Sequence, residues 1–125
     1  MTKPNSRARD LLPLPVHVLQ ILVALLDRPQ NGYAILKSIE AQAGGEGRLG
    51  TSTLYAALRR LLALGLIVEA EAPDDADSDD ARRRYYDVTP FGRDVVAAEA
   101  SRIRRLSALL DRLPGLSASP ERGRS

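Results

Sequence analysis

Five arginines are the residues of this chain whose type and spacing indicate a chemical role. Arg59 and Arg60 lie in a leucine-rich segment with no acidic residue within eight positions on either side, and Arg82–Arg84 form an unbroken run. A guanidinium group carries five N–H donors in a planar fork that fits phosphate oxygens and the major-groove edge of guanine. These arginines therefore predict contact with nucleic acid, and the alternative for Arg59 and Arg60 is an ordinary solvated helix face.

The chain offers little for catalysis or metal binding. It has one histidine, His17, and no cysteine, so neither a disulfide nor a thiolate metal site can form. The five aspartates within residues 74–80 lack the central glycine and the closing glutamate of an EF-hand loop. No nucleophile lies beside a general base in the sequence pattern. We therefore expect no catalytic residue, no metal and no cofactor, and we do not expect an enzyme.

The composition is that of one small domain. The 125 residues are 44% hydrophobic, enough for a single modest core. The formal net charge of +2 hides an uneven distribution, because the acidic stretch at 74–80 offsets basic segments elsewhere. The N-terminus has no apolar stretch typical of a secretory signal, and no apolar run approaches the roughly 20 residues of a membrane span. We expect a cytoplasmic protein that does not bind membranes.

Helices are expected before and after a short hairpin. Aliphatic residues three and four positions apart predict helices over residues 15–27, 32–43 and about 51–64. Thr51 or Ser52 would cap the third helix, and Gly65 would end it. Strands are expected at residues 66–72 and 85–88, joined by a polar loop, with one of Tyr85 and Tyr86 buried and the other exposed.

The last expected helix runs from Pro90 to about Leu113. Its apolar residues alternate in steps of three and four, which is typical of a coiled-coil seam; they are Ile103, Leu106, Leu110 and Leu113, extended backwards by Val96. A monomer could bury this stripe on its own core. However, a helix of about 24 residues is about 36 Å long and overshoots so small a core. We therefore expect a homodimer joined through this helix.

The predicted fold is mainly α with a small β-hairpin, a winged helix-turn-helix followed by a long C-terminal dimerisation helix. A two-stranded hairpin is unstable alone in water and must pack on the helices. We expect a basic flexible tail at residues 1–12 and a DNA-binding domain at 13–89. The dimerisation helix then spans 90–113, and a disordered tail spans 114–125.

Four motifs in order resemble the PadR-like family of regulators over residue 16 to about 113. They are a Gly-Tyr pair entering the second helix (Gly32-Tyr33), a Thr-Leu-Tyr segment in the third (53–55), a Leu-Gly-Leu-Ile ending (64–67) and a Tyr-Tyr-x-x-Thr-x-x-Gly segment (85–92). The resemblance implies a homodimeric repressor that binds an inverted-repeat operator in double-stranded DNA. It also implies that the repressor releases the operator when it binds a small-molecule effector.

The expected DNA contacts lie on the third helix and beside the return strand. Small residues at the start of a helix allow it to sit deep in the major groove, where base edges are distinct. The candidates are Thr51, Ser52, Thr53, Tyr55, Ala56, Arg59, Arg60, Arg82, Arg83 and Arg84. Tyr55 is either a phosphate-contacting hydroxyl or a half-buried core residue, and we expect Tyr33 to pack between helices.

The acidic loop departs from what a DNA-gripping wing requires. Phosphates dominate DNA affinity, so a wing tip should be basic or neutral. We expect this tip to stay out of the groove while Arg82–Arg84 contact the backbone. The alternative function is a winged-helix protein-interaction module that does not bind DNA specifically.

Overall fold

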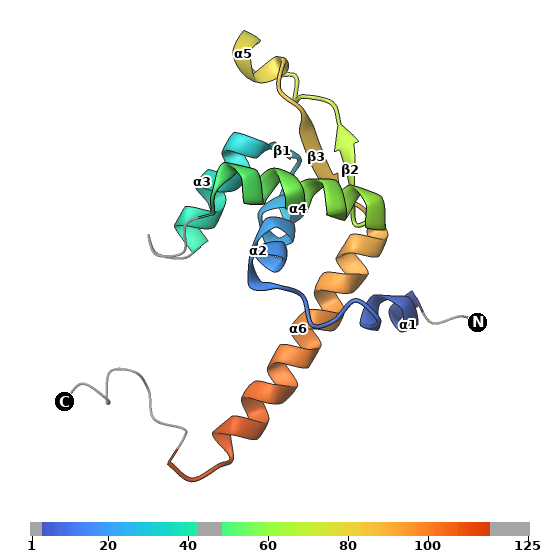
Figure 1. Cartoon of the computed structure of the whole chain (residues 1–125), viewed down its shortest axis with the longest axis vertical. Coiled ribbons are helices and arrows are strands. Elements are labelled where there is room, and N and C mark those ends of the chain that lie inside the picture. Colours follow the sequence, from blue (N-terminus) through green and yellow to red (C-terminus); the bar gives the residue numbers. More distant parts are fainter. Residues whose placement is uncertain (1–3, 43–48, 116–125) are drawn as a thin grey trace, which may run out of the picture.

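The computed structural model describes residues 4–42 and 49–115 of the chain. These residues form a small helical body with a sheet at one end and a long helix projecting from the other (Figure 1). In chain order the elements are α1 (Pro4–Arg9), α2 (Val16–Leu26), β1 (Gln30–Asn31), α3 (Gly32–Gln42), α4 (Thr51–Leu64), β2 (Ile67–Ala70), α5 (Ser78–Ala81), β3 (Tyr85–Val88) and α6 (Pro90–Asp111). The expected fold class is confirmed.

The core lies between α2, α3 and α4, the three helices that the aliphatic spacing predicts. Each helix turns one stripe of side chains inward. The fully buried members are Ile21, Leu22 and Leu25 of α2, Ile35 and Ile39 of α3, and Leu54, Leu58 and Leu61 of α4. Gly65 ends α4 in the left-handed conformation, at φ 78°, as expected of a glycine cap. The predicted end of the second helix, at residue 43, lies outside the described residues.

The expected hairpin forms, and a third strand joins it. β2 and β3 pair in antiparallel register from Ile67 opposite Val88 to Ala70 opposite Tyr85. β1 pairs with the other edge of β3, so the sheet order is β1-β3-β2. β1 has two residues, too few to show the alternation that marks a strand in a sequence.

The expectation of one exposed tyrosine in the return strand is wrong. Tyr85 and Tyr86 are both buried, at 6% and 4% exposure. Successive side chains of a strand point to opposite faces, and here both faces are covered. The Tyr85 hydroxyl accepts a hydrogen bond from the Asn31 amide (3.2 Å), while Tyr86 lies beside Tyr55 and Leu58 of α4. Burial raises the pKa of Tyr86, so its hydroxyl stays protonated.

Within the segment expected to be a basic flexible tail, residues 1–12, residues 4–9 form the helix α1. α1 packs against α6, with Ala8 fully buried and the Arg7 guanidinium 5.0 Å from the centre of the Phe91 ring. A six-residue helix has little stability of its own. Its stability therefore comes from contacts with a distant part of the chain, which no local pattern reveals.

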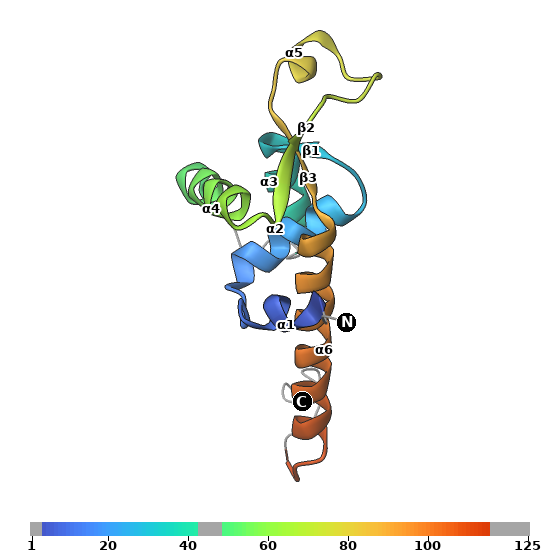
Figure 2. The same cartoon turned by 90° about the vertical axis from the view of Figure 1, so that its right-hand side faces the viewer.

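α6 begins at the predicted cap. The Thr89 side chain accepts a hydrogen bond from the backbone N–H of Gly92 (3.0 Å), and Pro90 occupies the first turn. The first half of α6 packs on the body, whereas the second half extends beyond it (Figure 2). Within residues 4–42 and 49–115, no helix is both long and apolar enough to cross a membrane.

A buried carboxylate that no sequence pattern singles out joins the N-terminal segment to α6. Glu99 is 1% exposed and accepts hydrogen bonds from the backbone N–H of Leu14 (3.0 Å) and from Nε (2.6 Å) and Nη2 (3.0 Å) of Arg102. The hydrogen bonds from Arg102 hold the pKa of Glu99 below its ordinary value of 4.5, against the opposing effect of burial. The ionised carboxylate therefore fixes the position of the segment between α1 and α2.

Candidate nucleic-acid interface

α4 presents a continuous outward ridge opposite its buried leucines. Ser52, Ala56, Arg59 and Ala63, spaced by four, three and four, are all exposed. The N-terminal half of this ridge carries only small side chains, and no acidic residue lies in the first turn. Such a ridge can approach the floor of a groove closely, and its positive charge suits a polyanion.

The N-terminus of α4 lacks the side-chain cap predicted at Thr51 or Ser52. Gly50 is the N-cap residue, and no side chain bonds to the first-turn N–H groups. Thr51, Ser52 and Thr53 are instead exposed at the start of the helix. The uncapped N–H groups and the positive end of the helix dipole are available to an anion such as a phosphate.

Arg59 lies on the outward ridge, whereas Arg60 lies beside it on the flank that faces the N-terminal segment. Arg59 lines a cavity of about 290 Å³ between α4 and the return strand, together with Arg84 and Tyr86. Arg60 lines a separate cavity of about 360 Å³ between α4 and the N-terminal segment. Both residues are exposed. The two arginines, neighbours in sequence, therefore face different surroundings.

Tyr55 rests on the first turn of α3. A methyl group built on Gly32 would collide with the Tyr55 hydroxyl, so the ring packs directly over the glycine. The side chain is 40% exposed. The ring therefore packs on α3, and a phosphate contact by its hydroxyl stays a prediction.

Tyr33 does not pack between helices as expected. It is 54% exposed, and its ring lies 5.4 Å from both the Lys37 ammonium group and the Arg83 guanidinium. The cation on an aromatic face is attracted by the negative centre of the ring. Lys37 was not among the expected DNA contacts, although its spacing of four from Tyr33 places the two on one helix face.

The wing, formed by β2, β3 and residues 71–84 between them, contains two exposed ion pairs. Arg83 forms an ion pair with Asp80 (3.3 Å), and Arg84 forms one with Glu69 (3.5 Å). All three residues of the run 82–84 are exposed. The predicted loop contains the short helix α5, whose N-cap Asp77 accepts a hydrogen bond from the backbone N–H of Asp80 (2.8 Å). The acidic tip is therefore an ordered turn close to the arginines.

The second half of α6 and the two residues that follow it carry an exposed apolar stripe. Its members are 41–50% exposed and comprise Ile103, Leu106, Leu110 and Leu113 of the predicted seam, together with Leu109. Val96, expected to extend the seam, instead packs against the core of its own chain. Elsewhere, the described residues contain no group of three His, Cys, Asp or Glu side chains that could hold a metal ion.

Three packed helices followed by an antiparallel hairpin, with the third helix turned outward, define a winged helix-turn-helix protein. A sequence model of the transcriptional regulator PadR-like family matches residues 21–98, from α2 into α6. The chain belongs to this family of transcription regulators. The resemblance inferred from the four motifs is thereby confirmed.

Solved structures at low sequence identity share the fold. A PadR family transcription regulator from Clostridium difficile R20291 matches with a TM-score of 0.65 and 23% identity, over 78% of this chain and 97% of that one. A PadR-like transcription factor from Bacteroides fragilis matches with a TM-score of 0.61 and 18% identity, over 85% and 91% of the two chains. These likenesses concern the arrangement of the elements.

A curated relative is closer in sequence. An uncharacterized 37.1 kDa protein in transposon TN4556 of Streptomyces fradiae is 40% identical over 87 residues. The match covers 70% of this chain but 23% of the relative, so the chain spans about a quarter of that protein's length.

Proposed function

We propose that this PadR-like protein represses transcription by binding an inverted-repeat operator in double-stranded DNA as a homodimer. The observation that carries the proposal is the surface of α4. Its inner face is packed in the core, whereas its outer ridge is exposed, contains no acidic residue and carries the guanidinium of Arg59. An exposed helix of this kind suits a major groove, where base edges can be distinguished.

In this proposal some residues contact the base edges and others contact the phosphate backbone. The small residues at the start of α4 and Arg59 lie against base edges, while the uncapped N–H groups of the first turn bind a phosphate. Lys37 and Arg83, which both contact the ring of the exposed Tyr33, bind the backbone beside the groove. Arg82 and Arg84 add further backbone contacts from the wing.

The homodimer is supported by the exposed stripe of α6. Two copies that bury Leu106, Leu109 and Leu110 against each other would remove apolar surface from water, at about 25 cal/mol per Å². The chain then divides functionally into a DNA-binding part, residues 13–89, and a dimerisation helix, residues 90–113. Two linked DNA-binding parts would bind two half-sites much more tightly than one part binds a single half-site.

Control by a small-molecule effector and a cytoplasmic location complete the proposal. Membership of a family of transcription regulators supports both, because a regulator of this kind acts where the DNA lies and responds to a signal. An operator-bound repressor is released when an effector binds the free form better than the DNA-bound form.

The acidic wing tip favours a second candidate function, a protein-interaction module. Asp74, Asp75, Asp77 and Asp79 are exposed and would repel phosphates, so a basic protein surface suits them better than DNA. Replacing all five aspartates of residues 74–80 with asparagine distinguishes the two candidate functions. If the repressor proposal holds, affinity for operator and random DNA rises by similar factors, and more so at low salt. Loss of operator binding would contradict it.

Selection of bound DNA from a random pool by the full chain tests the proposed function. We expect enrichment of an inverted repeat whose half-sites lie about one helical turn apart, with affinity that falls steeply with salt. A pool that shows no enriched sequence, or binding that ignores salt concentration, would contradict the proposal.

A further inference from the structure

An apolar cavity lies beneath the proposed DNA-binding helix. It has a volume of about 360 Å³ and is enclosed by the segment from Leu11 to Val18 on one side and by α4 on the other. This volume is within the range of small-molecule sites. Its position differs from that of the exposed stripe of α6, so the cavity and the proposed dimer contact are separate features.

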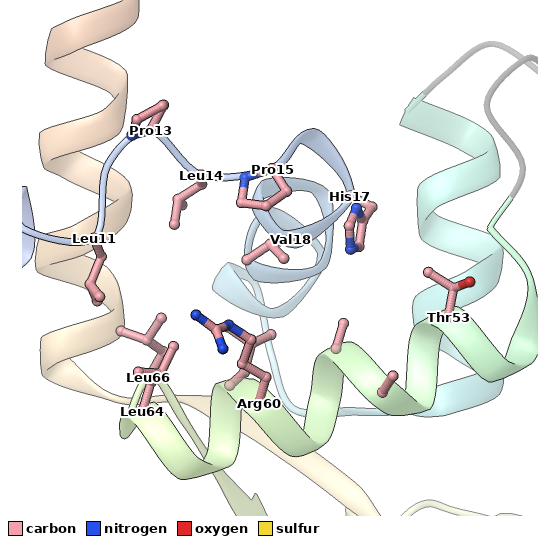
Figure 3. Close-up of a pocket in the computed structure, with 13 residues that line it drawn as sticks. Leu11, Pro13, Leu14, Pro15, His17, Val18, Thr53, Arg60, Leu64 and Leu66 are labelled. Carbon is pink, nitrogen blue, oxygen red and sulfur yellow. The ribbon is translucent and has the colours of Figure 1, made fainter.

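One charged side chain enters this cavity. The Arg60 guanidinium extends from α4 into the space between Leu11, Leu14 and Leu66 (Figure 3). Among the described residues, no aspartate or glutamate lines the cavity, and Arg60 has no acidic partner within ion-pair distance. A guanidinium beside apolar walls and without a carboxylate partner is suited to bind an anion.

The other residues that line the cavity indicate what the uncharged part of the ligand should be. They are aliphatic, formed mainly by Leu11, Leu14, Val18, Leu61, Leu64 and Leu66, and His17 supplies the one aromatic ring among the described residues that line the cavity. Aliphatic walls bury an alkyl chain well, and they outnumber the His17 ring and the Arg60 guanidinium, the two groups here that could stack on a planar aromatic ligand. The complementary ligand is therefore a monoanion on a flexible alkyl chain.

We propose that this cavity binds a medium-chain aliphatic carboxylate, with Arg60 as its anion contact, and that such a ligand releases the protein from DNA. The cavity is also lined by Thr53 and Ala56, which belong to the proposed DNA-binding surface. A carboxylate paired with Arg60 adds a negative charge beside α4, which opposes binding of the DNA backbone. Only this coupling rests on the proposed function; ligand binding itself does not.

Calorimetric titration of the full chain without DNA tests the binding site. The ligands are octanoate and octan-1-ol, which share an alkyl chain and differ in charge. We expect octanoate to bind at least about tenfold more tightly, as a charge-assisted hydrogen bond allows. Arg60→Met should abolish this difference, whereas Arg59→Met, the matched control on the outward ridge of α4, should preserve it. Equal affinity for both ligands, or a difference that survives Arg60→Met, would overturn the proposal.

Methyl NMR spectra locate the bound ligand. Octanoate should shift the methyl signals of Leu14, Val18 and Leu64 and leave those of Leu109 and Leu110 on α6 unchanged. Shifts confined to α6 would show nonspecific binding to the exposed stripe and would overturn the cavity assignment. The folded state of each variant is checked in the same spectra.

The coupling to DNA is measured separately, by octanoate titration into the operator complex. We expect octanoate to weaken operator binding, and the operator to weaken octanoate binding by the same factor, because coupling is reciprocal. If the protein binds no DNA but binds octanoate as described, the proposed function fails and the ligand site stands. If both bind without affecting each other, the regulatory role is overturned.

Discussion

Gly32 and Tyr55 are in direct contact across the junction of α3 and α4: a methyl group on Gly32 would lie 3.0 Å from Cζ of Tyr55 and would collide with its hydroxyl oxygen. Glycine at this position therefore sets where the tyrosine lies on the proposed DNA-binding surface. The hydroxyl is the far end of a flexible side chain that is 40% exposed, so it can move when the space is filled.

Gly32→Ala should consequently weaken operator binding while leaving the melting temperature almost unchanged. The added methyl displaces the Tyr55 ring, whereas alanine itself is tolerated in a helix. In a Tyr55→Phe background Gly32→Ala should reduce operator affinity by less, because the colliding oxygen is gone. Anisotropy titrations and thermal melts of the single and double variants check this. Additive effects of the two substitutions on DNA affinity would contradict the contact.

Gly92→Ala, unlike Gly32→Ala, should destabilise the folded protein. Its methyl would overlap the backbone carbonyl of Leu66 and lie 2.7 Å from Cγ2 of Val88, and the carbonyl cannot rotate away. Overpacking of this kind costs about 1–3 kcal/mol or more. We expect a clear loss in the free energy of unfolding, measured by urea denaturation. A variant as stable as Gly32→Ala would show that α6 approaches β2 less closely than described.

Glu99→Gln should destabilise the protein by about 2 kcal/mol at neutral pH, since it replaces an acceptor of two Arg102 hydrogen bonds with an amide. The pKa of Glu99 is lowered in the folded protein, so its contribution is complete above the ordinary value of 4.5. It is lost as pH falls through the lower folded value. The stability difference between wild type and variant should therefore narrow in acid.

Urea denaturation across this pH range measures the difference, with the exposed Glu40→Gln as control. If the difference in free energy of unfolding between wild type and Glu99→Gln stays constant well below pH 4.5, the role of the ionised carboxylate is contradicted. A control that loses as much stability as Glu99→Gln would contradict it as well.

Leu106→Asp combined with Leu110→Asp should give a folded monomer with much weaker operator binding. Both leucines are about half exposed in the single chain, so their replacement leaves the core intact while placing charges in the proposed dimer contact. Ser107→Asp with Ala108→Asp is the control, because it adds the same charge to exposed positions outside the stripe. Sedimentation velocity distinguishes the outcomes. A dimer that survives the leucine substitutions, or a monomeric wild type, would refute the role of α6.

The core helices and the C-terminal helix could be predicted from the sequence because their signals are local. The spacing of Leu54, Leu58 and Leu61 fixes the inner face of α4, and Thr89-Pro90 marks the start of α6. In contrast, α1 and β1 are short elements stabilised by distant segments, so local spacing does not reveal them. The burial of both Tyr85 and Tyr86 likewise depends on what covers each face of β3.

The candidate interface could be predicted in part. The exposed positions of α4 follow from the sequence, because they are the positions that do not belong to the leucine stripe. The wing follows from its two strand patterns and the polar loop between them. No local pattern predicts that Tyr33 lies between Lys37 and Arg83, which come from different elements. Nor does any local pattern show that Arg60 enters a cavity, because the opposite wall of that cavity is the segment from Leu11 to Val18, which is distant in sequence from α4.

The central claim, that the outer ridge of α4 reads DNA, is tested most directly by Arg59→Ala in anisotropy titrations on the selected operator and on random DNA. Arg104→Ala removes another exposed arginine, from α6, and is the control. We expect Arg59→Ala to weaken operator binding by about 1–3 kcal/mol and Arg104→Ala to leave it unchanged. Operator affinity that is equal in wild type and Arg59→Ala, or reduced as much by Arg104→Ala, would contradict the account.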